Sequence, residues 1–176
     1  MVTEQEKTAE ALKMAIQMET DGKEFYLKAS KKSSNDMGKT LLQTLAKEED
    51  LHRIKFQEIY DAISKEMAWP TVDLHPDGGK NLKTVFATVT REISSDNKGS
   101  STELEAVQTG MAMENKTYDL YIARGEKASG SAEKDFYKSL SVQERMHYQI
   151  LQDYYEYLKD PAGWFIRKEH PSLDGG

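Results

Sequence analysis

The sequence predicts an all-α protein: a four-helix bundle of two antiparallel helix hairpins, joined by a long crossover that contains a short extra helix. Four long stretches carry apolar residues at i, i+3 or i+4, and i+7, which is the spacing of a helix that buries one face. Short polar connectors separate the two stretches of each pair. A longer segment rich in turn residues separates the pairs, as in bundles with one long crossover.

The first hairpin is expected to combine a helix over about residues 3–32 with a second over about 37–67. The connector between them is short enough for antiparallel neighbours. We expect Ser34 or Asp36 to cap the second helix, because a side-chain oxygen at that point can accept a hydrogen bond from a free backbone N–H. A Trp-Pro pair then ends this helix, since proline lacks the N–H that a further turn needs.

The second hairpin is expected over about residues 102–127 and 132–159, again with a short polar connector. Thr102 and Glu105 have the spacing of a capping box, in which the side chain of each residue accepts a hydrogen bond from the backbone N–H of the other. Ser131 is the residue expected to cap the fourth helix. The two hairpins should therefore have similar lengths and similar connectors.

The crossover covers about residues 68–101, and the helical spacing of apolar residues within 82–93 predicts a short amphipathic helix there. We interpret residues 1–160 as one bundle domain and residues 161–176 as a C-terminal tail. The crossover helix and the Trp-Phe pair of the tail are expected to cover the bundle or to contact a partner subunit.

The composition narrows the function classes. Hydrophobic residues make up 38% and charged residues 31% of the 176, which is typical of a soluble globular protein. The net charge of −6 argues against non-specific nucleic-acid binding and against attraction to membranes. Neither a signal peptide nor a transmembrane segment is recognisable, so we expect a cytoplasmic protein.

The chain has no cysteine, which excludes disulfides, iron–sulfur clusters, zinc knuckles and a thiol nucleophile. Any metal must therefore be held by His, Asp or Glu, a ligand set that suits iron, manganese or zinc.

An internal repeat points to such a metal site. A shift of 95 residues superposes the second hairpin on the first without a gap. Both hairpins then share a Glu-x-x-His motif on one helix and a Met-Glu pair with a following tyrosine on the other. The matched positions are Glu19 with Glu114, Tyr26 with Tyr121, Glu49 with Glu144, and His52 with His147.

The repeat also selects between two neighbouring glutamates. Either Glu48 or Glu49 could share a helix face with His52, at spacings of four and three residues. Glu48 falls on Gln143 in the repeat, whereas Glu49 falls on Glu144. We therefore interpret Glu49 as the ligand and Glu48 as a flanking residue.

The matched glutamates lie at equal distances from the connectors, so an antiparallel hairpin places them at one height. Two hairpins packed face to face would bring four carboxylates and two imidazoles together inside the bundle. Four buried carboxylates without compensation would cost many kcal/mol, whereas two divalent cations would neutralise them. The pattern predicts a dinuclear metal site with the ligands Glu19, Glu49, His52, Glu114, Glu144 and His147.

Other residues of metal-binding or redox type have simpler interpretations. A single Glu-x-x-His on a charged helix is weak support, and only its duplication carries the argument. Tyrosines near the motifs are more often core packing than redox groups: Tyr26, Tyr118 and Tyr121. Methionines are expected to fill the core rather than bind metal: Met14, Met18, Met111, Met113 and Met146. His75 and His170 are expected to be ordinary surface histidines.

Four segments carry a family resemblance: METDGKEFY, EEDLH, MENKTYDLY and QERMH. In them the chain resembles the ferritin-like di-iron carboxylate proteins, specifically the rubrerythrin branch, over about residues 9–158. The tail beginning DPAGWF is similar to tails of stand-alone members of that branch. The paired Glu and Glu-x-x-His set is the arrangement known for ferritin-like di-iron bundles.

The resemblance assigns a role to each predicted ligand. It implies that Glu19 and Glu114 each bind one metal, that Glu49 and Glu144 bridge both, and that each histidine completes one metal's ligands. It also implies tyrosines beside the site. Tyr26 and Tyr121 would hydrogen-bond ligand carboxylates and assist catalysis from outside the ligand set.

Two departures from the family pattern stand out. Full-length rubrerythrins carry a cysteine-ligated rubredoxin domain, which a cysteine-free chain cannot form. They also carry an additional glutamate three residues after the ligand of the third helix. That position is Thr117 in this chain.

The resemblance implies an oxidoreductase of oxidative-stress defence that reduces hydrogen peroxide, or dioxygen, at two iron ions. Manganese or zinc could substitute for iron. Electrons would come from an external donor such as rubredoxin or a flavoprotein, and the protein would be a homodimer. The first alternative is an iron-binding ferroxidase for iron oxidation, storage or delivery. The second is a metal-binding protein without turnover.

Overall fold

The computed structural model describes residues 4–65, 68–72, 74 and 99–169. Its helices are α1 (Glu4–Lys32), α2 (Asp36–Ser64), α4 (Ser101–Lys127), α5 (Ser131–Lys159) and α6 (Pro161–Glu169). This part of the chain contains no strand, which confirms the predicted all-α class.

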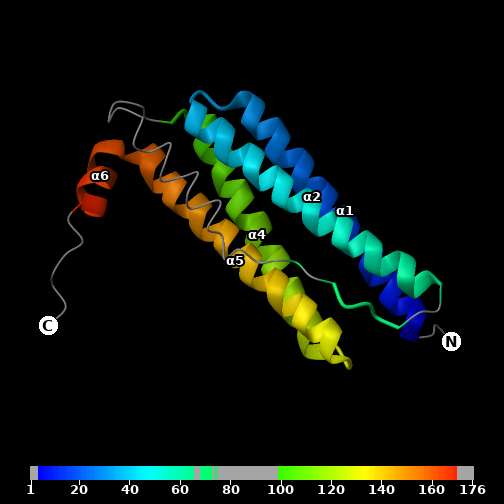
Figure 1. Ribbon diagram of the computed structural model, residues 1–176. Coiled ribbons are helices and arrows are strands. Elements are labelled where there is room, and N and C mark those ends of the chain that lie inside the picture. The colour runs from blue at the N-terminus through cyan, green and yellow to red at the C-terminus, as the bar shows by residue number, and fades with distance from the viewer. Residues whose placement is uncertain (1–3, 66–67, 73, 75–98, 170–176) are drawn as a thin grey trace, which may run out of the picture.

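The four long helices form an elongated bundle of two antiparallel hairpins (Figure 1). The first hairpin packs α1 along α2, and the second packs α4 along α5. The hairpins meet through contacts of α1 with α4 and of α2 with α5, while α6 packs against the end of α5. The arrangement therefore places the same face of each hairpin toward the other.

Neither residue predicted to cap α2 does so, because Ser34 precedes the cap and Asp36 is the first residue of the helix. The N-cap of α2 is Asn35, whose side chain accepts a hydrogen bond of 2.7 Å from the backbone N–H of Gly38. Ser34 is not the cap because its hydroxyl donates instead to the Glu103 carboxylate of the other hairpin, at 2.8 Å. A contact between hairpins therefore decides which polar residue caps α2.

The predicted capping box of the third helix was also wrong. The helix α4 begins at Ser101, and the side chain of Ser100 accepts a hydrogen bond from the backbone N–H of Glu103. The side chain of Glu103 lies buried at the end of the bundle, where it accepts hydrogen bonds from Ser33 at 2.5 Å and Tyr154 at 2.7 Å. This cluster ties the tip of the first hairpin to both helices of the second.

Two further boundaries differ slightly from expectation. Ser131 is the first residue of α5 rather than its cap, and the N-cap Gly130 contributes no side-chain hydrogen bond. The helix α2 ends at Ser64, with the backbone N–H of Lys65 bonded to the carbonyls of Ala62 and Ile63.

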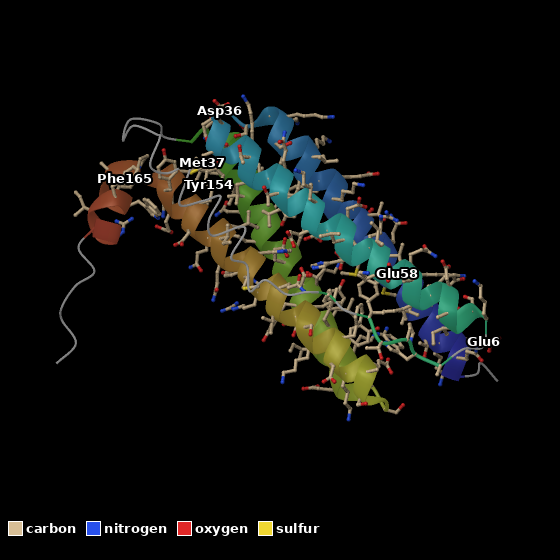
Figure 2. All side chains as sticks on the ribbon, in the orientation of Figure 1. Glu6, Asp36, Met37, Glu58, Tyr154 and Phe165 are labelled. Carbon is tan, nitrogen blue, oxygen red and sulfur yellow. The ribbon has the colours of Figure 1, made fainter. Side chains whose placement is uncertain are left out.

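Two hydrophobic clusters fill the bundle, one toward each end. One includes Tyr26, Met37, Leu151 and Tyr154, and Figure 2 labels Met37 and Tyr154 at the end where α6 lies. The other includes residues from the opposite ends of the same four helices, among them Phe56. Each helix thus contributes to both clusters, and the predicted ligands lie in the sequence between the two contributions.

The predicted C-terminal tail contains the helix α6. Trp164 of this helix is buried against Tyr157 with ring centroids 5.8 Å apart, and Phe165 packs beside it. The aromatic pair thus covers the end of the bundle. The expected crossover helix at 82–93, as well as His75 and His170, lies outside the described residues.

The methionine interpretation was wrong at one position, because Met14 is 54% exposed and fills no core space. Met111, in contrast, packs against the first hydrophobic cluster as expected. None of the helices in the described segments combines the length and apolar character needed to cross a membrane.

Candidate metal centre

Six acidic and imidazole side chains from four helices meet in the middle of the bundle. Each is at most 3% exposed, although each carries a group that ordinarily titrates. Their ligand atoms form two groups, in each of which all atoms lie within 4.8 Å of one another. One group contains Glu49, Glu114, Glu144 and His147, and the other contains Glu19, Glu49 and His52. Glu49 belongs to both.

The local helix geometry explains this convergence. Glu49 and His52 are three residues apart on α2 and project from one face, as do Glu144 and His147 on α5. Glu19 and Glu114 come from the partner helix of each hairpin, at the same height along the bundle. The structure therefore brings together all six residues that the repeat predicted as ligands.

Each imidazole faces the motif glutamate of the other hairpin. The Nδ1 of His52 lies 3.1 Å from Glu144 Oε1 and 3.5 Å from Glu19 Oε2. The Nδ1 of His147 lies 3.1 Å from Glu49 Oε1 and 3.4 Å from Glu114 Oε2. The two rings are stacked, with centroids 5.7 Å apart. The contacts repeat across the two hairpins, as the internal repeat in the sequence predicts.

Five ligand-type atoms at this point are buried with no hydrogen-bond partner other than one another. They are Glu19 Oε2, Glu49 Oε1, Glu144 Oε1, His52 Nδ1 and His147 Nδ1. Buried polar atoms nearly always have partners, because leaving one unsatisfied costs about 1–3 kcal/mol. When the imidazoles are neutral, as metal binding requires, all five atoms present lone pairs to the same small space. This set fits a pair of metal ions, since oxygen and imidazole nitrogen are the ligands of iron, manganese and zinc.

The pKa values of the glutamates at the site are shifted from their usual values. Burial and the neighbouring carboxylates of Glu114 and Glu19 raise the pKa of Glu49 well above its usual value. Burial, together with the charge of Glu114, raises the pKa of Glu144 to about 8. Without a cation, Glu144 would therefore hold a proton at neutral pH, and the raised pKa of both motif glutamates reflects the excess of negative charge.

The other two glutamates behave in the opposite way. Burial is the largest effect and would raise the pKa of Glu19 and of Glu114, but the positive charges of His52 and His147, together with hydrogen bonds from neighbouring side chains, outweigh it and lower both pKa values. Burial disfavours the charged imidazole of His147, yet Glu114 and Glu144 raise its pKa to about 9. In the metal-free protein, the positive charge of protonated imidazoles thus offsets part of the negative charge of the carboxylates, as bound cations would.

Two tyrosines donate to the ligand carboxylates. Tyr26 of α1 donates its hydroxyl hydrogen to Glu114 of α4, and Tyr121 of α4 donates to Glu19 of α1. Both tyrosines are fully buried. Each bond crosses from one hairpin to the other and leaves the second oxygen of the carboxylate for a metal.

Gln143 is a site residue that the sequence interpretation missed. Its Oε1 lies 3.1 Å from His52 Nε2, so the ring donates from Nε2 and presents the lone pair of Nδ1 to the centre. The matching position in the first hairpin is Glu48, which belongs to neither ligand group. The charge of Glu48 nevertheless contributes to the raised pKa of His147.

Thr117 is the second missed contact. Its hydroxyl lies 3.1 Å from Glu144 Oε2 and 3.0 Å from the backbone carbonyl of Glu114, and its single hydrogen is shared between these acceptors. The residue that stands where the family has an additional glutamate therefore contacts the carboxylate of Glu144. The repeat pairs Thr117 with Gly22, because the two positions differ by 95. A Cβ on Gly22 would lie 3.0 Å from Glu49 Oε2, so the glycine makes room for that carboxylate. In the sequence, this position is marked only by the fact that the two hairpins carry different residues there, glycine in the first and threonine in the second.

Comparison with known proteins agrees with this geometry. The family model for rubrerythrin matches residues 10–155. No curated protein matches the chain. No solved structure matches it either.

Proposed function

Since the chain belongs to the rubrerythrin family, we propose that the buried glutamate and histidine cluster holds two iron ions at which the protein reduces hydrogen peroxide or dioxygen. The observation that carries the proposal is the convergence of six buried ligand side chains, five of whose atoms have no hydrogen-bond partner other than one another. Such a set is unfavourable as a purely structural core, because buried anions without cations destabilise the fold.

The assignment of ligands follows from the contacts. One metal would be held by His52 and Glu19, and the other by His147 and Glu114. The motif glutamates would bridge, because Glu144 lies within 3.1 Å of His52 and 3.9 Å of His147, and Glu49 belongs to both ligand groups. When bound, the iron pair would supply the two-electron redox chemistry.

The protein's own contribution is positioning and exclusion of water. The hydrophobic clusters on either side of the site exclude water from it, and Phe56 and Leu151 in them are both fully buried. Tyr26 and Tyr121 fix two carboxylates and hold phenolic protons directly on them. These protons lie one hydrogen bond from the ligands, where a reduction that consumes protons needs them.

A second candidate function is iron oxidation for storage or delivery. The observation that favours it is Thr117, whose hydroxyl supplies a hydrogen bond where the family pattern has a further carboxylate. This candidate calls for a large hollow assembly, whereas the first is proposed to act as a homodimer. Size-exclusion chromatography separates these outcomes.

The test of the proposed function is a single-turnover experiment. Protein purified without oxygen is loaded with ferrous iron and mixed with either hydrogen peroxide or dioxygen, and iron oxidation is followed by absorbance. Rapid oxidation by peroxide, followed by repeated turnover with an added electron donor, supports the reductase. Oxidation by dioxygen with release of ferric iron supports the second candidate.

Glu49→Gln should abolish either reaction, because the residue belongs to both ligand groups. Glu24→Gln is the matched control, since this residue lies exposed on α1 outside both groups. Bound iron that reacts with neither oxidant would leave a metal-binding protein without turnover.

A further inference from the structure

A connected set of aromatic rings leads away from one side of the metal centre. It begins at Tyr121, whose hydroxyl donates to the ligand Glu19. The ring of Tyr121 lies 6.1 Å from that of Tyr137, and Tyr137 lies 5.9 Å from Trp69, centroid to centroid. Tyr121 and Tyr137 are buried, whereas Trp69 is only half-buried. The set thus connects a ligand to the outer part of the bundle.

The chemical identity of these rings matters more than their packing. Tyrosine and tryptophan can each lose one electron at potentials that biological oxidants reach, whereas phenylalanine cannot. Electron tunnelling weakens steeply with distance, so closely spaced redox-active rings transfer electrons faster than one long step. Phe56 and Phe136 pack around the set, but the tyrosine and tryptophan rings alone form an unbroken series from Glu19 to Trp69.

The internal repeat supplies a comparison within the same molecule. Tyr26 makes the equivalent hydrogen bond to Glu114, and its ring packs edge-on against Phe25 at 5.3 Å. Adding 95 to position 69 gives 164, so Trp69 corresponds to Trp164. Subtracting 95 from position 137 gives 42, so Tyr137 corresponds to Leu42, a residue that cannot be oxidised in this way. Tyr154, Tyr157 and Trp164 form a ring series on that side, at 6.5 and 5.8 Å, but among the described residues the only aromatic ring in contact with that of Tyr26 belongs to Phe25. A series that reaches a ligand-bound tyrosine is therefore found on the Tyr121 side.

We propose that Trp69, Tyr137 and Tyr121 form the route by which single electrons from an external one-electron carrier reach the metal centre. The inference rests on the proposed redox function and adds the path and its direction. The donor would approach the half-buried Trp69, which is the outermost ring of the series.

Electrons and protons balance along this route. Tyr121 would give one electron to the centre after peroxide or dioxygen has oxidised it, and its phenolic proton would move along the existing hydrogen bond to Glu19. Tyr137 then reduces Tyr121, whose proton returns, and Trp69 reduces Tyr137. Glu133, which precedes Tyr137 by four residues and therefore lies on the same face of α5, can hold the phenolic proton of that ring meanwhile. The reduced carrier finally restores Trp69, so one electron leaves the carrier and one reaches the centre.

The test uses metal-free protein and runs the same couplings in reverse. Because the chain has no cysteine, Thr71→Cys provides a single exposed attachment point two residues from Trp69. A ruthenium polypyridyl photo-oxidant is attached there, in a Trp164→Phe background that leaves Trp69 as the remaining tryptophan. A flash then oxidises Trp69, and transient absorption follows the tryptophan radical and any tyrosyl radical.

We expect the tryptophan radical to decay as a tyrosyl radical appears, with Tyr121 as its final location. Tyr137→Phe keeps the ring but removes the intermediate station, so it should slow this decay by at least an order of magnitude. Tyr121→Phe should leave the radical on Tyr137, which electron paramagnetic resonance distinguishes. Tyr26→Phe is the matched control and should leave the decay of the tryptophan radical unchanged in the metal-free protein.

An unchanged decay in Tyr137→Phe, or an equal slowing in Tyr26→Phe, would overturn the proposal. Thermal melting confirms that each variant is folded. Because no metal is present, this result is independent of the proposed function. If the rings conduct but the protein binds no metal, the proposed function fails and the route loses its acceptor, and if metal binds but the rings do not conduct, only the route fails.

Discussion

Replacing one bridging candidate should stabilise the metal-free protein while removing its metal site. Glu144 is fully buried, and its pKa is raised from 4.5 to about 8 by burial and by Glu114. At neutral pH the folded metal-free chain must therefore keep a proton on this carboxyl that the unfolded chain has released. Glu144→Gln removes that requirement, and an amide oxygen can still accept the hydrogen bond from Thr117.

The magnitude follows from the shift. Near a pH of about 7.5, holding the proton costs about 4 kcal/mol, because each pH unit above the unfolded pKa adds about 1.4 kcal/mol. Loss of the contact with His52 takes back part of this gain, so we expect a net stabilisation of about 2–3 kcal/mol. At about 2–4 °C per kcal/mol for a chain of this size, the Tm should rise by about 5–10 °C.

The assay is urea and thermal unfolding in the presence of a chelator, followed by the same measurement with added metal. Glu24→Gln is again the control, with no change expected in either condition. In Glu144→Gln, the Tm increase caused by added metal should be small or absent, since stabilisation by a ligand depends on its affinity for the folded state. A metal-free variant less stable than the original, together with an undiminished metal response, would refute the reasoning.

Three further predictions concern protons and the residues around the ligands. The metal-free protein should lose stability as pH rises from about 6 to 9, because His147, with a pKa of about 9, and Glu144, with a pKa of about 8, hold protons in the folded state that the unfolded chain releases. Added metal should reverse this trend, since it competes with those protons. Urea unfolding at several pH values, with and without metal, checks the sign of both trends. Gln143→Leu removes the hydrogen-bond partner of His52 Nε2 and should weaken metal affinity by about 10–100-fold in competition with a chelator, whereas unchanged affinity would show that the amide does not orient the ring. Gly22→Ala should also weaken metal binding in that competition, because the new Cβ would lie 3.0 Å from Glu49 Oε2, and Gly130→Ala, where nothing lies within 4 Å of the added atom, should not.

The fold class and the positions of the six candidate ligands were predictable because each depends on a period. Helical spacing of apolar residues marked the four long helices, and the shift of 95 residues separated Glu49 from Glu48. Two similar hairpins packed face to face bring their corresponding positions together, so the repeat predicted which residues would lie close in space. That information concerned position only, and it assigned no metal.

The features that the sequence did not reveal depend on contacts between the hairpins. Ser34 looks like a cap in isolation, but the carboxylate of Glu103 on the other hairpin takes its hydroxyl, and Asn35 caps the helix. The hydrogen bonds of Gln143 and Thr117 arise where the two halves differ, so a repeat could mark those positions without showing their partners. Differences between the halves were therefore as informative as their similarity.

The central claim is that the buried cluster holds two metal ions per chain, bridged by glutamates from both hairpins. Anaerobic equilibrium dialysis against ferrous iron measures this directly. The account predicts two ions per chain in the original protein and loss of binding in a variant that combines Glu49→Gln with Glu144→Gln, with Glu24→Gln unaffected. Binding of no iron by the folded protein, or two ions still bound in the double variant, would contradict it.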